Sequence, residues 1–176
     1  MATVKEFEPE KLILGVIYHD KEVFDEAMRL FCERFGDYDF VSEEFSFSEE
    51  YSSYYDGELG GEGMRRIYSF ERLVDPSLQV EIKEFTNEIE ARFSRKINLD
   101  PGLMNQGRLT LMSTKDSGFR IPLKDGIYAE LTLFYAKGGW QKLPWTYRDY
   151  QSGKTQNFLL KVRKSYMAER KIKLKE

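Results

Sequence analysis

The stretch "LILGVIY", Leu12–Tyr18, is a continuous apolar run close to the start of the chain. Seven consecutive residues without a charge predict a strand that is buried on both faces. Asp20 follows as an expected helix N-cap, and apolar residues then recur at helical spacing up to Phe35, before Gly36. The chain therefore begins with a buried strand and an amphipathic helix.

The rest of the chain also contains both helix-like and strand-like patterns of apolar residues. Asp75-Pro76 predicts the start of a second helix, whose apolar stripe runs from Leu78 to Phe93. A third helix is expected from about residue 155 to 171. Further strands are predicted at 40–48, 64–74, 108–114, 119–123 and 127–135, the last two joined as a β-hairpin by Lys124-Asp125-Gly126.

This order predicts an α+β fold. The first six elements match a ferredoxin-like βαββαβ core, extended by the β-hairpin and the C-terminal helix. We expect a mostly antiparallel sheet with the helices on one face. The length of 176 residues suits a single domain, residues 1–176.

The composition excludes several classes of protein. Cys32 is the only cysteine, so an intrachain disulfide cannot form. No run of 18 apolar residues is present, and the first residues lack the apolar region of a secretory signal. We therefore expect a cytoplasmic protein without a membrane partner.

Charge is unevenly distributed along the chain. Residues 43–62 contain seven acidic residues and no Lys or Arg, whereas residues 161–176 contain seven basic and two acidic residues. Nucleic-acid binding usually needs a broad basic face. A short basic tail beside an acidic segment does not match this requirement, so a nucleic-acid partner is not expected.

The residue inventory limits metal and nucleophile chemistry. His19 and Cys32 are the only residues of their types, so no metal site of the usual Cys/His kind is expected. The cofactor stays unknown. Mg²⁺ prefers oxygen ligands, which leaves Asp100, Glu130 and Asp149 as candidate carboxylates.

The segment "SGKT", Ser152–Thr155, has the same ending as a phosphate-binding P-loop. A complete motif needs a glycine, four further residues and then Gly-Lys-Thr, and this chain has Arg148 at the position of that first glycine. The alternative is a loop that enters a helix with Thr155 as its cap.

Two other segments carry polar residues in a recognisable pattern. Lys83, Thr86, Asn87 and Glu90 share one face of the second helix, which is either an ordinary solvent face or part of a site. Four glycines in residues 54–64 indicate a mobile segment, either a lid over a site or plain disorder.

Several stretches resemble one bacterial family, a domain of unknown function numbered DUF4416, whose members are sometimes labelled GTP-binding. These stretches are "YYDGELG" (54–60), "IKEFTNEIE" (82–90), "RKINLDPG" (95–102), "STKD" (113–116), "GIYAELTL" (126–133) and "PWTYRDY" (144–150). The resemblance covers nearly the whole chain and implies no mechanism.

Our first hypothesis is a site for a small anionic or phosphorylated molecule, either a binding or a catalytic site. Charged residues on a covered sheet face need partners, which are salt bridges or a ligand. Trp145 and Tyr147 would form a stacking wall. The candidate ligand-binding residues are Glu58, Lys83, Asn87, Asp100, Lys115, Arg120, Glu130, Trp145, Tyr147 and Asp149.

The alternative is a non-enzymatic interaction module or a homodimer. Tyr128 and Phe134 alternate with Glu130 and Thr132 along one predicted strand. Aromatic residues between polar ones are also typical of a protein interface.

Overall fold

The structure is a computed structural model that describes residues 2–173, within which nine strands form one sheet. In chain order the strands are β1 (Glu10–Tyr18), β2 (Tyr38–Val41), β3 (Phe45–Ser46), β4 (Met64–Val74), β5 (Ile97–Met104), β6 (Arg108–Ser113), β7 (Arg120–Lys124), β8 (Ile127–Ala136) and β9 (Gly139–Lys142). The helices are α1 (Lys21–Phe35), α2 (Phe47–Glu50), α3 (Asp56–Leu59), α4 (Gln79–Arg92) and α5 (Gly153–Lys173), with short 3₁₀ turns η1 (Pro76–Leu78) and η2 (Arg148–Gln151).

The strands follow the order β2-β4-β1-β5-β6-β8-β7, while β3 pairs with β4 and β9 with β8. Each of these pairs is antiparallel. The fold is therefore α+β with an antiparallel sheet, as expected. Residues 174–176, which include Lys175 of the basic tail, lie outside the described residues.

Strand β1 lies between β4 and β5 and is buried along its whole length, so the two-sided burial predicted for "LILGVIY" is confirmed. Alternate residues point to opposite faces. Leu12, Leu14 and Val16 join the core under α1 and α4, whereas Ile13 joins a second core with Leu159 and Val162 of α5.

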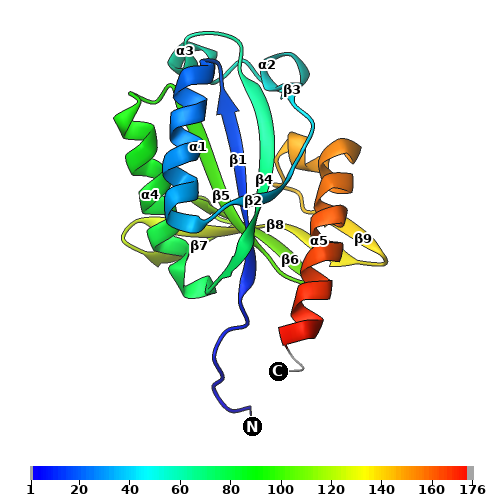
Figure 1. The fold of residues 1–176 in the computed structure, drawn as a ribbon. Helices are drawn as coiled ribbons and strands as arrows, with labels where there is room; N and C mark the ends of the chain where they lie inside the picture. The colour runs from blue at the N-terminus through cyan, green and yellow to red at the C-terminus, as the bar shows by residue number, and fades with distance from the viewer. Residues whose placement is uncertain (1, 174–176) are drawn as a thin grey trace.

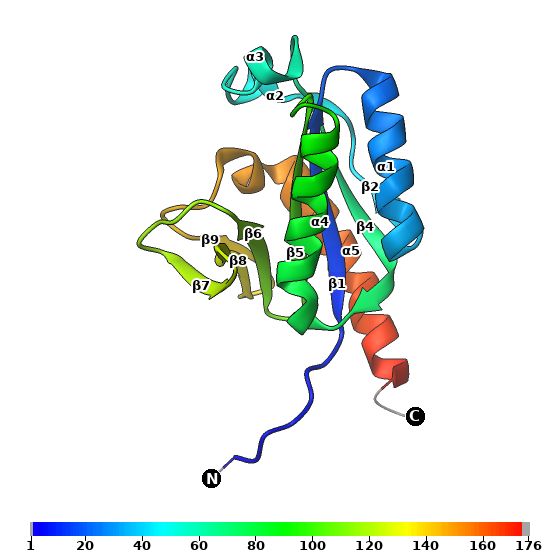
Figure 2. The ribbon, with the colours of Figure 1, turned by 90° about the vertical axis from the view of Figure 1, so that its left-hand side faces the viewer.

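The prediction that the helices lie on one face is wrong. Helices α1 and α4 cover one face, and α5 covers the other (Figures 1 and 2). A strand that is apolar on both sides needs cover on both sides. The described helices include none that is long and apolar enough to cross a membrane.

Helix α1 has the N-cap, the buried face and the C-terminal glycine that its sequence predicts. The carboxylate of Asp20 accepts hydrogen bonds from the backbone amides of Glu22 and Val23, which have no partner within the helix. The apolar stripe predicted for this helix is also its buried face, and Gly36 follows the last turn in a positive-φ conformation.

Strand β5 was not predicted. It follows α4 directly and pairs with β1, whereas the sequence prediction gave 108–114 as the first strand after the second helix. Pro101 and Gly102 interrupt the strand pattern in the sequence, because both are rare inside strands. The proline is tolerated because β6 pairs with β5 only from Gly102 to Met104. Pro101 therefore lies where β5 has no partner on its β6 side.

The segment from residue 38 to 63 contains more and shorter secondary-structure elements than predicted. The single strand expected at 40–48 is two short strands, β2 and β3, and the polar loop that follows contains α2 and α3. The hairpin of β7 and β8 is confirmed with its turn at Asp125-Gly126, while β9 was not predicted.

The close contact of β5 with β6 gives a stability prediction. A Cβ atom added at Gly102 would lie 2.6 Å from the Thr110 carbonyl oxygen and 2.7 Å from Leu111 Cδ2. We expect Gly102→Ala to lower the free energy of unfolding by about 1–3 kcal/mol, as overpacking does in other cores. Urea denaturation measures this change.

Gly139→Ala is the matched control, because its added Cβ would have no neighbour within 4 Å. Equal stability of the Gly102→Ala variant and the wild type would show that β6 can move away from β5 without cost.

Candidate functional site

A polar cleft opens where β5 and β6 separate. The two strands pair only at Gly102–Met104, so the earlier part of β5 and the end of β6 diverge around a space of about 370 Å³. Helix α4, the segment before α3 and the segment before η2 complete the walls. The lining residues are Tyr54, Tyr55, Lys83, Asn87, Glu90, Ala91, Arg95, Asn98, Asp100, Met112, Ser113, Thr114, Lys115 and Tyr147.

One wall of the cleft is the polar stripe of α4. Lys83 is only 6% exposed, and its ammonium group donates a hydrogen bond to the Leu99 carbonyl at 3.2 Å. Glu90 accepts a hydrogen bond from the Leu99 amide at 2.6 Å. Burial raises the pKa of the Glu90 carboxyl, while the charge of Lys83 acts in the opposite direction. Thus the stripe faces a cleft and not bulk solvent.

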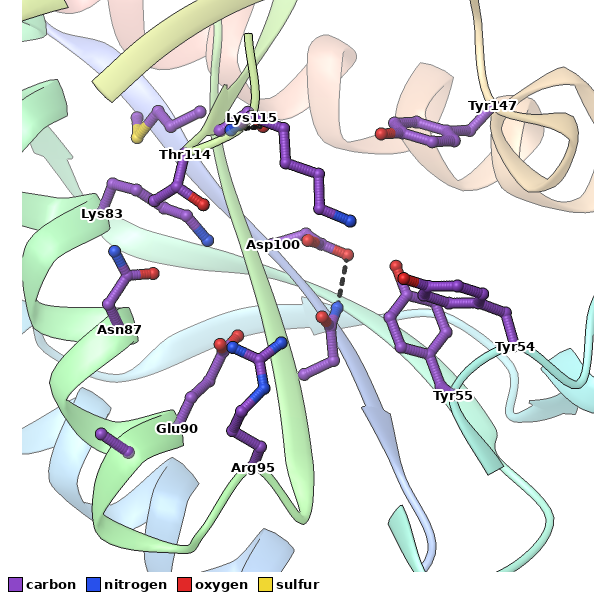
Figure 3. Close-up of a pocket in the computed structure, with 14 residues that line it drawn as sticks. Tyr54, Tyr55, Lys83, Asn87, Glu90, Arg95, Asp100, Thr114, Lys115 and Tyr147 are labelled. Atoms are coloured by element: carbon purple, nitrogen blue, oxygen red, sulfur yellow. Dashed lines mark hydrogen bonds between the residues drawn. The ribbon is translucent and has the colours of Figure 1, made fainter. Parts of the chain in front are cut away.

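The floor of the cleft is formed by Asp100 of β5. Its Oδ2 atom accepts a hydrogen bond from Asn98 Nδ2 at 2.8 Å and another from Arg65 Nη1 at 3.2 Å. Figure 3 shows the carboxylate of Asp100 between the α4 side chains and the tyrosines. Asp100 therefore joins the cleft to the buried side chain of Arg65.

The opposite wall carries three tyrosines, Tyr54, Tyr55 and Tyr147 (Figure 3). Arg120 stands behind this wall. Its Nη2 atom donates to the Tyr147 hydroxyl at 2.8 Å, and its Nη1 atom donates to the Lys115 carbonyl at 2.7 Å. Lys115 in turn places its ammonium nitrogen 5.6 Å from the centre of the Tyr54 ring. Arg120 thus positions two lining residues without lining the cleft itself.

Arg95 reaches the cleft from the turn between α4 and β5. Ser94 and Arg95 both have positive φ angles, 51° and 60°, which cost backbone energy in residues other than glycine. The Arg95 guanidinium is exposed and lies 3.0 Å from the carboxylate of Glu58 in α3. Glu58 therefore touches the site only through Arg95.

The ten predicted residues divide into two groups. Lys83, Asn87, Asp100, Lys115 and Tyr147 line one cleft. The other five do not line it: Glu58, Arg120, Glu130, Trp145 and Asp149.

The residues outside the cleft have partners within the protein. Glu130 is buried and pairs with Arg120 at 3.1 Å. Trp145 stacks on Phe119 with ring centres 5.1 Å apart, and its indole N–H donates to the Leu131 carbonyl at 2.8 Å. Salt bridges and packing within the protein satisfy these side chains.

Asp149 belongs to a buried network around Arg65. The Arg65 side chain is 2% exposed, and its Nη2 atom lies 3.0 Å from Asp149 Oδ2. Burial raises the pKa of the Asp149 carboxyl above its ordinary value, although Arg65 acts to lower it. The ring of Tyr150 lies beside the guanidinium, with its centre 5.6 Å away. This network packs directly behind the floor of the cleft.

Of the three carboxylates considered for Mg²⁺, Asp100 and Asp149 both contact the cation of Arg65, and Glu130 pairs with Arg120. In residues 2–173 no group of three or more His, Cys, Asp and Glu side chains could hold a metal ion.

The "SGKT" segment is the start of α5. The Thr155 amide donates to Ser152 Oγ at 3.2 Å, so Ser152, and not Thr155, caps the helix. Lys154 lies 3.5 Å from the carboxylate of Glu50, and neither Lys154 nor Thr155 lines the cleft described above.

The sequence prediction missed several lining residues. Tyr54 and Tyr55 lie in "YYDGELG", and Arg95 and Asn98 lie in "RKINLDPG". Both stretches are among those that resemble the DUF4416 family. This resemblance is the signal in the sequence that could have identified these residues. Glu90 lay on the predicted polar stripe but was not chosen as a candidate.

The fold and the site define an α+β protein with a polar cleft beside an antiparallel sheet. The chain belongs to the family described as Domain of unknown function (DUF4416), whose model matches residues 8–166. No curated protein and no solved structure matches the chain.

The Arg65 network gives a second stability prediction. Arg65→Met leaves Asp149 as a buried carboxylate without its cation, so we expect the free energy of unfolding to fall by about 3–5 kcal/mol. The double variant Arg65→Met/Asp149→Asn should regain part of this loss, because it removes the uncompensated charge. Urea denaturation of both variants measures the two effects.

Arg66→Met is the control, because the Arg66 side chain is 36% exposed and that of Glu44 33%, so loss of this ion pair should cost less than loss of the buried pair. If Arg65→Met were no more destabilising than Arg66→Met, the buried pair would not be a major source of stability.

Proposed function

We propose that the cleft binds a small anionic molecule, with a phosphorylated compound as the best-fitting class. The observation that carries this proposal is the environment of Lys83. The side chain is buried, yet within residues 2–173 its ammonium group forms no ion pair and makes a single hydrogen bond, to a backbone carbonyl. Burying a charge is costly unless the charge is paired.

Lys11 shows how this protein treats a buried lysine that has a structural role. Lys11 is 0% exposed, and its ammonium nitrogen lies 2.5 Å from the carboxylate of Asp39 and 3.0 Å from that of Glu169. Lys83 lacks such contacts, although Glu90 attracts it through space. The difference supports a role for Lys83 towards a ligand that brings its own negative charge.

The other cations of the cleft support the same ligand. Arg95 and Lys115 line the cleft with Lys83, whereas Glu90 and Asp100 are the acids among the lining residues (Figure 3). Guanidinium and ammonium groups form strong charge-assisted hydrogen bonds with phosphate oxygens. An anion bound between these cations would form the ion pair that Lys83 lacks within residues 2–173.

Substitution of Lys83 tests the proposal. We expect inorganic pyrophosphate or glycerol 3-phosphate to bind the wild type in isothermal titration calorimetry and to raise its melting temperature. Lys83→Met keeps the length of the apolar stem but removes the charge. It should weaken binding by about 10- to 100-fold, the value of one or two hydrogen bonds to a charged group.

Lys124→Met is the matched control, because Lys124 is an exposed lysine at the β7–β8 turn, outside the cleft. The proposal fails if none of these anions binds the wild type at millimolar concentration, or if both variants bind them as the wild type does.

A second candidate function, self-association, is favoured by apolar side chains at the β7 edge of the sheet. Ile121 is 64% exposed, and Phe119 and Leu123 are also exposed. Exposed apolar groups on an edge strand are typical of interaction surfaces. A second copy of the chain would cover them. Phe134, named with Tyr128 in the homodimer hypothesis, is exposed farther along β8, where it pairs with Gln141 of β9.

Sedimentation velocity tests this candidate. If β7 forms an interface, the wild type should sediment as a dimer and Ile121→Glu as a monomer. Ile172→Glu, on α5, controls for the added charge at another exposed isoleucine. A wild type that stays monomeric at the highest soluble concentration excludes the interface.

We also infer that β1-α1-β2-β4-α4-β5 is a ferredoxin-like unit. The strand order β2-β4-β1-β5 with antiparallel pairing supports this inference, since it is the order that a split βαβ arrangement produces. The cleft lies at the border between this unit and the strands that extend it.

A further inference from the structure

The two oxygens of the Asp100 carboxylate have different surroundings. Oδ2 accepts both hydrogen bonds that the carboxylate receives, from Asn98 and from Arg65. No described residue donates a hydrogen bond to Oδ1. Asp100 lines the cleft, and its side chain is one-third exposed (33%). One carboxylate oxygen is therefore fixed from behind while the other is free to accept a bond from a bound molecule.

A free carboxylate oxygen specifies a donor on the ligand. An ionised carboxylate can only accept hydrogen bonds, and a fully ionised phosphate cannot supply one. The donor must therefore belong to another part of the ligand, and it is either a neutral group, such as a hydroxyl or an amide N–H, or a protonated amine. A protonated amine would meet Lys83, Arg95 and Lys115 in the same cleft, and like charges repel. A hydroxyl group fits this environment without repulsion.

The remaining lining residues suit a molecule with several hydroxyls. Asn87 and Asn98 carry amides, and Ser113 and Thr114 carry hydroxyls, all of which can donate and accept. The Tyr54 ring is exposed and packs edge-on against Tyr55, with ring centres 5.1 Å apart at 89°. The negative face of such a ring attracts the C–H groups of a polyol or sugar.

We propose that the ligand of the cleft is a phosphorylated polyol of the sugar-phosphate class. Its phosphate meets Lys83, and one of its hydroxyls donates to Oδ1 of Asp100. The volume of about 370 Å³ lies within the range of small-molecule sites. This inference rests on the proposed anion-binding function. It adds the chemical class of the rest of the ligand, beyond its phosphate group.

A matched pair of ligands separates the hydroxyl contact from the phosphate contact. Glycerol 3-phosphate and n-propyl phosphate have the same phosphate and a three-carbon chain, and they differ in two hydroxyl groups. Titration calorimetry of the wild type should give at least about tenfold tighter binding of glycerol 3-phosphate, since a hydrogen bond to a charged group contributes that much. Ribose 5-phosphate extends the series to a sugar.

Asp100→Asn tests the residue. The substitution keeps the size of the side chain and an oxygen that can accept from Asn98, but it removes the charge. The preference for glycerol 3-phosphate should fall to less than about threefold, whereas n-propyl phosphate should bind at least as well as to the wild type. Because Asp100 also contacts Arg65, its substitution can affect folding, so thermal melts must establish that the variant is folded. The comparison of the two ligands in the wild type does not depend on this variant.

The outcomes distinguish this inference from the function on which it rests. Equal binding of the two phosphates by the wild type, with loss of both in Lys83→Met, leaves the anion site standing and overturns the polyol. A preference that persists unchanged in Asp100→Asn also overturns it, because another residue then recognises the hydroxyls. Binding of inorganic pyrophosphate without binding of either phosphate or of ribose 5-phosphate overturns this inference alone. Failure of all four compounds to bind overturns the anion site and this inference together.

Discussion

The buried guanidinium of Arg65 is the constraint on which the centre of the structure depends. Arg65 belongs to β4, and its side chain crosses β1 at Gly15, where a Cβ atom would lie 2.7 Å from Nη2. On the other side of β1 it meets Asp100 of β5, and it meets Asp149 of η2. Each buried ion costs several kcal/mol in lost hydration, and the two carboxylates beside the guanidinium offset part of that cost. The glycine inside "LILGVIY" therefore leaves room for a charge that joins two strands and the segment before α5.

Much of the fold could be predicted from the sequence because its elements have a clear period. The apolar run of β1, the helical stripe of α1 and the alternation in β8 each follow from local residues alone. Strand β5 was missed because Pro101 and Gly102 argue against a strand. The same two residues mark where β6 stops pairing with β5, so the feature that hid the strand lies at the origin of the cleft. A local sequence pattern cannot reveal where this strand pairing ends, because the pairing depends on which strand lies next to Pro101.

The candidate site was predictable in part, for a related reason. Polar residues at helical spacing, such as Lys83 and Asn87, can face solvent or a cleft, and the spacing is the same in both cases. The sequence also cannot indicate which carboxylates are already paired. Asp149 and its partner Arg65 lie in segments far apart along the chain, whereas Asp100 shares that partner and still faces the cleft. Partner choice is set by the packed structure, and residue type alone does not reveal it.

Asp100 connects stability with recognition. Its orientation is fixed by Arg65 and Asn98, which are in place before any ligand enters. A carboxylate held in this way loses little conformational freedom on binding, so more of its hydrogen-bond energy remains for affinity. The other side of the cleft differs, because Tyr54 and Arg95 are exposed and Arg95 is tied to the short helix α3 through a surface ion pair. Selectivity for the shape of the ligand should therefore come from the β5 floor and the α4 wall, while the tyrosine side adapts to what these two surfaces hold.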